Sequence, residues 1–385
     1  MRAVAVIGAN FGDCGKGHIT DYLVAEAPDE TVVVRYNGGA QAGHTVETPE
    51  GLRHVFHHFG SGTLLGAPTF LSRHFIVNPM AWKEELGALR EIGVEPTLYV
   101  DPRCRITTPY DMLADQALQK HGSCGLGIHQ TVARNANGIR FVAASQNARE
   151  VCRVIREQAR GKLVSSSQPS RRLAWLEDDE ILENYLTDLA ELQGSVTFTQ
   201  RIPEYDRVVF EGAQGLLLDE EHPNFPYVTH SQTGLSNVAT LCHEHGIGEV
   251  RALYVTRSYM TRHGPGPFPT EDDRMSYPDA TNVPNEFQGT LRFGDLDELA
   301  LVSEIEHDLR CVDGLAVTTG LAVTCLDQHP MEFWPALVPT MIESYGPRRN
   351  DIEVTSLAAP RRAVGPLPLR ESRRSKPATG GKNER

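Results

Sequence analysis

The sequence predicts an α/β protein with a mostly parallel central sheet and flanking helices. Short apolar runs that are typical of strands alternate with longer segments of helical periodicity, a pattern that favours parallel strands. Glycine-rich loops follow the first two runs, and in parallel sheets ligands bind at the carboxyl ends of strands. The expected strands lie at residues 2–7, 31–35, 75–77, 97–100, 207–210, 252–255 and 315–319, and expected helices at 18–25, 79–92 and 178–192.

Composition and charge narrow the class of protein. Hydrophobic residues make up 40% of the 385 residues and charged residues 23%, which is ordinary for a folded enzyme. The net charge of −13 disfavours a protein that coats nucleic acid, because phosphate backbones bind clustered Lys and Arg. The seven cysteines form no CxxC pair, which argues for a reducing compartment and against structural zinc. With neither a membrane-length apolar run nor a charged leader, we expect a cytoplasmic protein.

The end of the chain differs in composition from the rest. Residues 361–385 mix Arg, Lys, Pro, Ser and Gly with few apolar residues, so we expect a basic, disordered tail. A nucleic-acid contact by this tail is the alternative interpretation. A polar, Pro-containing stretch at 165–170 is expected to be a surface loop.

The first glycine-rich loop is composed for phosphate binding. It reads Gly12-Asp13-Cys14-Gly15-Lys16-Gly17 and precedes an expected helix. Backbone amides, a lysine and a helix N-terminus together predict a phosphate cradle. The loop is not a Walker A motif, because Asn10 takes the place of the first glycine and Gly17 replaces the Ser or Thr after the lysine. Taken alone, it is also consistent with a tight strand-to-helix turn.

Two residues in these loops are catalytic candidates. Asp13 places a carboxylate inside the phosphate loop, where it repels a nucleotide unless magnesium or a proton transfer makes use of it. His44 lies on the second loop between Gly43 and Thr45, where an imidazole can donate to developing negative charge. A structural histidine is the alternative for His44.

Five segments, taken together, resemble a known family. They are residues 12–17, Arg35-Tyr36-Asn37-Gly38-Gly39-Ala40-Gln41-Ala42-Gly43-His44-Thr45, Phe210-Glu211-Gly212-Ala213-Gln214-Gly215, Pro226-Tyr227-Val228-Thr229 and residues 261–271. In content and order they are similar to the signatures of adenylosuccinate synthetases, over residues 1 to about 330. The resemblance implies the P-loop-like fold of that family, a single catalytic domain over residues 1–360 with inserted subdomains, and a homodimer.

The resemblance also implies a reaction. The family joins L-aspartate to carbon 6 of a 6-oxopurine monophosphate, using a nucleoside triphosphate and Mg²⁺. Asp13 would remove the proton on N1 so that O6 attacks the γ-phosphate, and His44 would stabilise the transferring phosphoryl group. The amine of aspartate would then displace phosphate. Magnesium would be held by Asp13 and the carbonyl of Gly43.

Other site residues follow by position in the matching motifs. The triphosphate contacts are Gly12, Cys14, Gly15, Lys16, Gly17, Gly43, Thr45 and Asp327; the purine monophosphate contacts are Asn37, Gln41, Ser123, Cys124, Arg134, Gln214, Thr229 and His263; the aspartate contacts are Gly289, Thr290 and Arg292. The resemblance implies that Arg134 reaches the 5′-phosphate bound by the neighbouring subunit. Alternatives are a loop amide for Gln214, a helix cap for Thr229 and a surface charge for Arg134.

Departures from the family pattern bear on the substrates. Thr324-Cys325-Leu326-Asp327 lacks the lysine of the segment that reads the guanine of GTP, and 355–360 lacks the usual Ser-x-Gly-Pro, so ATP or dATP is favoured as donor over GTP. The arginine-rich loop is contracted to 289–295, with Arg292 as its one arginine. These features resemble the bacteriophage PurZ branch, which makes a 2-aminoadenine DNA precursor from dGMP in the host cytoplasm.

Two other functions remain open from the sequence. The same ligase acting on IMP with GTP fits most of the motifs, because hypoxanthine shares N1–H and O6 with guanine. A P-loop nucleotide hydrolase or regulator without aspartate transfer is the alternative from another class. The lack of Ser or Thr after Lys16 and the presence of His44 argue against it.

Overall fold

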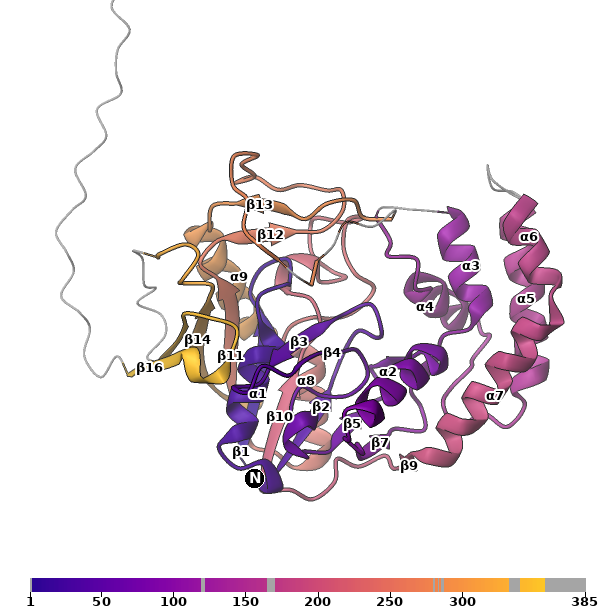
Figure 1. The fold of residues 1–385 in the computed structure, drawn as a ribbon, viewed down its shortest axis with the longest axis horizontal. Coiled ribbons are helices and arrows are strands. Elements are labelled where there is room, and N and C mark those ends of the chain that lie inside the picture. Colours follow the sequence, from indigo (N-terminus) through magenta and orange to yellow (C-terminus); the bar gives the residue numbers. More distant parts are fainter. Residues whose placement is uncertain are drawn as a thin grey trace, which may run out of the picture.

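The computed structural model describes residues 2–118, 122–164, 170–279, 281–282, 284, 287–331 and 340–356 (Figure 1). The strands of the main sheet are β1 (Arg2–Gly8), β2 (Thr31–Arg35), β5 (Thr69–Leu71), β7 (Leu98–Val100), β9 (Thr197–Phe198), β10 (Arg207–Glu211), β11 (Glu249–Arg257), β14 (Ala316–Thr324), β15 (Thr340–Ser344) and β16 (Ile352–Ser356). The helices are α1 (Lys16–Ala25), α2 (Pro79–Glu91), α3 (Pro109–Leu118), α4 (Ile128–Ala136), α5 (Ala148–Val164), α6 (Ser170–Glu177), α7 (Asp179–Ser195), α8 (Leu235–His245) and α9 (Glu298–Arg310). Short 3-10 turns lie at Pro28–Glu30, Thr63–Leu65, Leu216–Leu218 and Arg349–Asp351.

The central sheet confirms the predicted fold class. Its order among the described residues is β16-β15-β14-β11-β1-β10-β2-β5-β7-β9. All neighbours pair in parallel except β15 and β16, which are antiparallel. β1, β10 and β2 lie at the centre, so the loops that follow them meet at one edge of the sheet, as expected for a ligand site.

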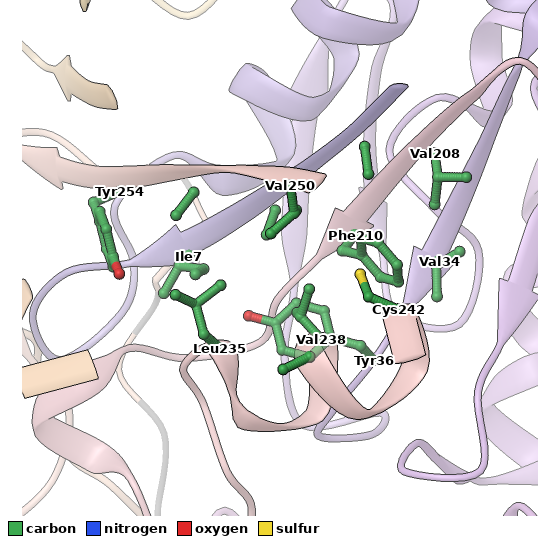
Figure 2. Close-up of a cluster of buried hydrophobic side chains, with 14 of the residues drawn as sticks. Ile7, Val34, Tyr36, Val208, Phe210, Leu235, Val238, Cys242, Val250 and Tyr254 are labelled. Atoms are coloured by element: carbon green, nitrogen blue, oxygen red, sulfur yellow. The ribbon is translucent and has the colours of Figure 1, made fainter. Parts of the chain in front are cut away.

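Helices cover both faces of the sheet. Alternate residues of β1 belong to different apolar clusters: Ala5 and Ile7 pack with α8 and α9, whereas Val6 packs with Ile19 and Val24 of α1. Figure 2 shows Leu235, Val238 and Cys242 of α8 lying against the strand side chains. This period-two alternation is what a sheet buried on both faces requires.

The remaining helices form a lobe beside the sheet. Figure 1 shows α3 to α7 gathered at the β9 end, and their apolar faces pack around Trp82, Tyr110, Cys152 and Leu189. No helix in the described part of the chain is long and apolar enough to cross a membrane.

The predicted strand at 75–77 is present but lies outside the central sheet, and the list of predicted strands was incomplete. The run at 75–77 contains β6 (Ile76–Val77), which pairs with β8 (Arg105–Ile106) in a separate two-stranded sheet and is not part of the central one. The predictions missed the three-residue β5, the hairpin of β3 (His44–Glu47) and β4 (Arg53–Phe56), and the pair of β12 (Met260–Arg262) with β13 (Arg292–Gly294). These strands are too short for a periodic signal. Of the predicted loop at 165–170, residues 165–169 lie outside the described residues and Ser170 begins α6; the predicted tail also lies outside them.

Candidate active site

The phosphate loop joins β1 to α1 in a left-handed conformation. Gly12, Asp13 and Gly15 have φ values of 98°, 48° and 85°. The Lys16 ammonium is buried and donates to the backbone carbonyl of Gln214 at 2.5 Å. The loop after β1 is therefore tied to the loop after β10, and a cation lies beside the N-terminus of α1. This is the arrangement predicted for a phosphate cradle.

Gly17 has a steric reason for departing from the Walker A pattern. A Cβ atom at this position would lie 2.9 Å from His44 Cβ and 2.9 Å from Ser61 Oγ. Only glycine allows His44 to pack directly against the first turn of α1. The missing hydroxyl after the lysine therefore makes room for the histidine.

His44 is held by a buried carboxylate. Its Nδ1 lies 2.7 Å from Glu211 Oε1 at the end of β10, and the Ser61 backbone N–H donates to Glu211 Oε2 at 3.1 Å. The Ser61 hydroxyl also donates to Glu211. Because the carboxylate accepts from Nδ1–H, the neutral ring carries its proton there. His44 Nε2 is buried and has no hydrogen-bond partner among the described residues.

At neutral pH, Glu211 is ionised and His44 is uncharged. Burial lowers the pKa of His44 to about 4, although the Glu211 charge opposes it. Burial raises the pKa of Glu211, but attraction to His44 and Arg35 outweighs this and lowers it to about 2. Arg35 Nη1 lies 3.9 Å from Glu211 Oε2. The result is a neutral imidazole on an ionised carboxylate, and an anion at Nε2 would favour the protonated ring.

Asp13 faces a second histidine. Its Oδ2 lies 3.1 Å from His263 Nε2, which is also 3.0 Å from Asn282 Oδ1. Burial raises the pKa of Asp13, but the hydrogen bond and charge of His263 outweigh it, with Arg257 and Lys16 adding to the effect, so the pKa is lowered. Arg257 also donates to the Asp13 carbonyl and binds Asp279 at 2.8 Å. Asp13 is therefore ionised and held beneath the loop that follows β12.

The candidate purine contacts divide into paired and unpaired amides. Both polar atoms of the Asn37 side chain are paired, since its amide donates to the Ala213 carbonyl at 3.1 Å and accepts from the Ala213 N–H at 2.7 Å. Both polar atoms of the Gln41 side chain and Oε1 of Gln214 are buried without a hydrogen-bond partner in the described residues. Thr229 is buried, and its N–H donates to the Leu218 carbonyl at 2.8 Å. Unpaired buried amides are costly, so Gln41 and Gln214 mark a place for a polar ligand.

The loop expected to bind the monophosphate lies between α3 and α4. Ser123 donates to Asp115 at 2.5 Å, and Asp115 also accepts the Gly127 N–H at 3.1 Å. Burial raises the pKa of Cys124 to about 11, so this thiol stays protonated. A Cβ on Gly122 would lie 2.4 Å from Pro265 Cδ, which places this loop against the loop that carries His263.

Two predicted site residues are engaged within the chain. The Arg134 side chain is 1% exposed and pairs with Asp111 at 2.8 Å, so the predicted contact across a subunit interface requires that pair to break. Arg292 binds both carboxylate oxygens of Glu271 and donates to the carbonyls of Gly264 and Gly266 at 3.0 and 3.1 Å. Their predicted roles remain predictions.

The other expected contacts lie around this centre. Thr45 Oγ1 is 2.9 Å from Thr281 Oγ1. Thr324 donates to the Cys14 carbonyl at 3.0 Å, so the end of β14 borders the phosphate loop and the exposed Asp327 follows three residues later. Gly43 precedes β3, and Gly289 and Thr290 precede β13. The segment 357–360 lies outside the described residues.

Sequence reasoning missed the residues that support the two catalytic candidates. Glu211, Arg35 and Arg257 hold His44 or Asp13 but were not singled out. Each ends a predicted or observed buried strand, at the edge where ligands bind. An ionisable residue at the carboxyl end of an apolar run was the signal that would have found them.

Comparison with known proteins identifies the family of this chain. A sequence profile of the adenylosuccinate synthetase family matches residues 5–323. The chain belongs to the adenylosuccinate synthetase family. Adenylosuccinate synthetases from Prochlorococcus marinus (strain MIT 9313) and Clostridium botulinum (strain Eklund 17B / Type B) are each 35% identical to it, over 292 and 294 residues and 70% of this chain. The chain spans 64% and 66% of the length of these relatives.

Two solved structures share the family fold. A fully ligated adenylosuccinate synthetase from Plasmodium falciparum has a TM-score of 0.66 at 19% identity, over 92% of this chain and 87% of its own. The cyanophage S-2L succinoaminodeoxyadenylate synthetase (PurZ), bound to dGMP and dATP, has a TM-score of 0.60 at 15% identity, over 91% of this chain and 95% of its own. At these identities the likeness concerns the fold alone.

Proposed function

We propose that this protein is a ligase that joins L-aspartate to carbon 6 of a 6-oxopurine nucleoside monophosphate, through a 6-phosphoryl intermediate. The observation that carries the proposal is that Asp13 lies in the phosphate loop and His44 packs against Gly17 at its end, with His44 Nε2, both polar atoms of the Gln41 side chain and Gln214 Oε1 buried and without a hydrogen-bond partner in the described residues. Family membership supports the same reaction.

The chemistry follows from the two centres. A 6-oxopurine is a poor electrophile, because oxide is a prohibitive leaving group. The Asp13 carboxylate takes the N1 proton, and its lowered pKa keeps the basic form available at neutral pH. O6 then forms a bond to the γ-phosphorus while the bond to the leaving nucleoside diphosphate breaks. The amine of aspartate adds at carbon 6, loses a proton and expels the phosphate.

His44 would stabilise the transferring group. Its unpaired Nε2 faces away from Glu211, and the negative charge of a bound triphosphate favours the imidazolium, whose Nε2–H donates to a phosphoryl oxygen. Lys16 supplies a second positive charge at the N-terminus of α1.

The residues also fit the proposed magnesium ion. Magnesium binds through one or two carboxylates, substrate phosphates and waters, so it needs no dedicated protein cage. Asp13 and the Gly43 carbonyl supply hard oxygen donors, and the described residues hold no cluster of three or more His, Cys, Asp or Glu side chains that would suit another metal. When bound, the ion would neutralise phosphate charge.

We propose dGMP as the purine substrate, with ATP or dATP as donor. The proposal is supported by Cys325, which stands in place of the lysine that reads guanine in the donor pocket. The phage enzyme that shares the fold is bound to dGMP and dATP. IMP with GTP is the second candidate, because the 35% identical relatives are adenylosuccinate synthetases. Asp13 suits either, since a carboxylate can also accept a hydrogen bond from the 2-amino group of guanine.

The domain organisation, oligomeric state and compartment of the protein are part of the same proposal. We propose a single catalytic domain over residues 1–360 that acts as a homodimer in the cytoplasm. All seven cysteines are free, which fits a reducing compartment.

The test is a substrate comparison. Purified protein is incubated with L-aspartate, magnesium and ATP, dATP or GTP, and dGMP, GMP and IMP are compared by chromatography of the products. We expect a succino-adduct of dGMP. Turnover of IMP alone would reject the dGMP proposal, and phosphate release that is unchanged without aspartate would reject the ligase.

A further inference from the structure

The Arg134 guanidinium, in the last turn of α4, is turned into its own chain. Its Nε lies 2.8 and 3.1 Å from the two carboxylate oxygens of Asp111. Its Nη2 donates to the Ile106 carbonyl, and its Nη1 to the Ile139 carbonyl at 3.4 Å. The side chains of Arg134 and Asp111 are 1% and 3% exposed. Every nitrogen of the guanidinium thus has an acceptor within the chain.

Asp111 stands where two helices begin. It accepts the Thr108 N–H at 2.9 Å and the Thr108 hydroxyl at 2.8 Å, which fixes the start of α3. Gly127, which precedes α4 with φ of 77°, is so close that a Cβ there would lie 3.0 Å from the Asp111 carbonyl carbon and 2.9 Å from Met112 N. Arg134 therefore ties the far end of α4 to the side chain of Asp111, and the backbone of the same residue packs against Gly127 at the start of α4.

The first turn of α4 borders three loops of the candidate site. A Cβ on Gly39, in the loop that leads to His44, would lie 3.0 Å from Ile128 Cδ1. His129 Nδ1 lies 2.6 Å from Nε2 of His230, the neighbour of Thr229. The Gly127 N–H and the Ser123 hydroxyl both donate to the Asp115 carboxylate. A shift of this turn would displace the loop expected to bind the monophosphate.

We propose that Arg134 is a positioning residue of its own chain, which acts through Asp111 to hold the first turn of α4 and the loop 122–127. The effect on substrate rests on the proposed function, because the ligand of that loop is the purine monophosphate. The proposal replaces the expectation that Arg134 serves the neighbouring subunit. Such a reach would break the Asp111 pair and leave a buried carboxylate without its cation, which is strongly unfavourable.

A double-mutant cycle tests whether Arg134 acts through Asp111. In R134M the carboxylate is buried and unpaired, and we expect the KM for the purine monophosphate to rise by at least about tenfold, with a smaller change in kcat. D111N keeps an acceptor for Thr108 but removes the charge, so D111N/R134M should recover most of the KM. R134K, which keeps the cation, should fall between R134M and wild type. No recovery in the double variant would overturn the proposal, because a lost phosphate ligand cannot be restored by changing Asp111.

Subunit mixing separates the two roles directly. R134M is mixed with D13A, each inactive or impaired alone. An arginine that acts across the interface would restore activity in mixed dimers, because the R134M subunit keeps Asp13 and would receive Arg134 from its neighbour. We expect no gain, and a gain in activity would overturn the proposal.

Amide hydrogen exchange measures how firmly the loop 122–127 is held, and it needs no enzymatic turnover. In R134M, we expect faster exchange over residues 122–131 and unchanged exchange in α8, with slower exchange restored in D111N/R134M. Unchanged exchange over 122–131 in R134M would overturn the proposal. If the wild type ligates aspartate to no 6-oxopurine monophosphate, the proposed function fails while this readout still decides the positioning role.

Discussion

Glu211→Gln tests how the carboxylate sets the state of His44. The substitution keeps the shape of the side chain but removes the charge that accepts from His44 Nδ1 at 2.7 Å and from the Ser61 N–H at 3.1 Å. An amide can offer its oxygen to one of these donors and turns its NH₂ toward the other. The His44 tautomer with a proton on Nδ1 is then no longer enforced, and Arg35 loses the anion 3.9 Å away.

Two magnitudes follow for E211Q. Removing one partner of a buried pair costs about 3–5 kcal/mol, so we expect the free energy of unfolding to fall by that order. The loss of one oriented donor to developing negative charge costs about 10²–10³-fold in rate, and we expect kcat to fall within that range. Urea unfolding measures the first, and aspartate-dependent phosphate release at saturating substrates measures the second.

The matched control is E85Q. Glu85 is also buried, but it accepts from the backbone N–H groups of His57, His58 and Phe59 and has no described hydrogen bond to His44. E85Q should therefore lose stability without a comparable loss of kcat. If E211Q retains the same kcat as E85Q at equal fractions folded, the assigned role of Glu211 is wrong.

Three further predictions concern neighbouring residues. Gly17→Ser restores the Walker A residue type but places Cβ 2.9 Å from His44 Cβ, so kcat and Tm should both fall; an improvement in triphosphate affinity and turnover would contradict the steric account. Glu271→Gln removes the ion pair of Arg292, so the KM for L-aspartate should fall. R292A should raise the same KM. An unchanged KM in R292A would rule out that arginine as the group that binds the carboxylate of aspartate. The pKa of His44 is lowered from 6.5 to about 4 in the fold, so its contribution to stability is complete above pH 6.5 and is lost as pH falls toward 4. Urea titrations should therefore show a smaller advantage of wild type over H44N at low pH, and a constant difference across that range would contradict the buried neutral state.

The sequence was sufficient to predict the class of fold. The run at 31–35 matches β2 (Thr31–Arg35), because a fully buried parallel strand is a continuous apolar run between breakers. Asp13 and His44 were predicted from their places in glycine-rich loops, and the structure brings both to the start of α1. Local pattern placed both residues beside the first helix, and their catalytic roles, which depend on the family resemblance, stay predictions.

Contacts between distant segments could not be predicted in this way. The Glu211 carboxylate meets His44 across 167 positions of sequence, and the Asp13 carbonyl meets Arg257 across 244. Such pairs depend on the strand order, which places β10 and β11 on either side of β1. The internal pairing of Arg134 was likewise hidden, because a charged residue on a helix does not reveal which face is buried.

The reaction path proposed for Asp13 and His44 predicts where the O6 atom of the purine goes. If O6 is phosphorylated and then displaced, that oxygen must leave with the phosphate. The purine monophosphate is prepared with ¹⁸O at position 6, turned over with L-aspartate and the triphosphate, and the released phosphate is analysed by mass spectrometry. We expect one ¹⁸O per phosphate released, in amounts equal to the succino-adduct. Unlabelled phosphate, formed at the same rate with or without aspartate, would contradict it.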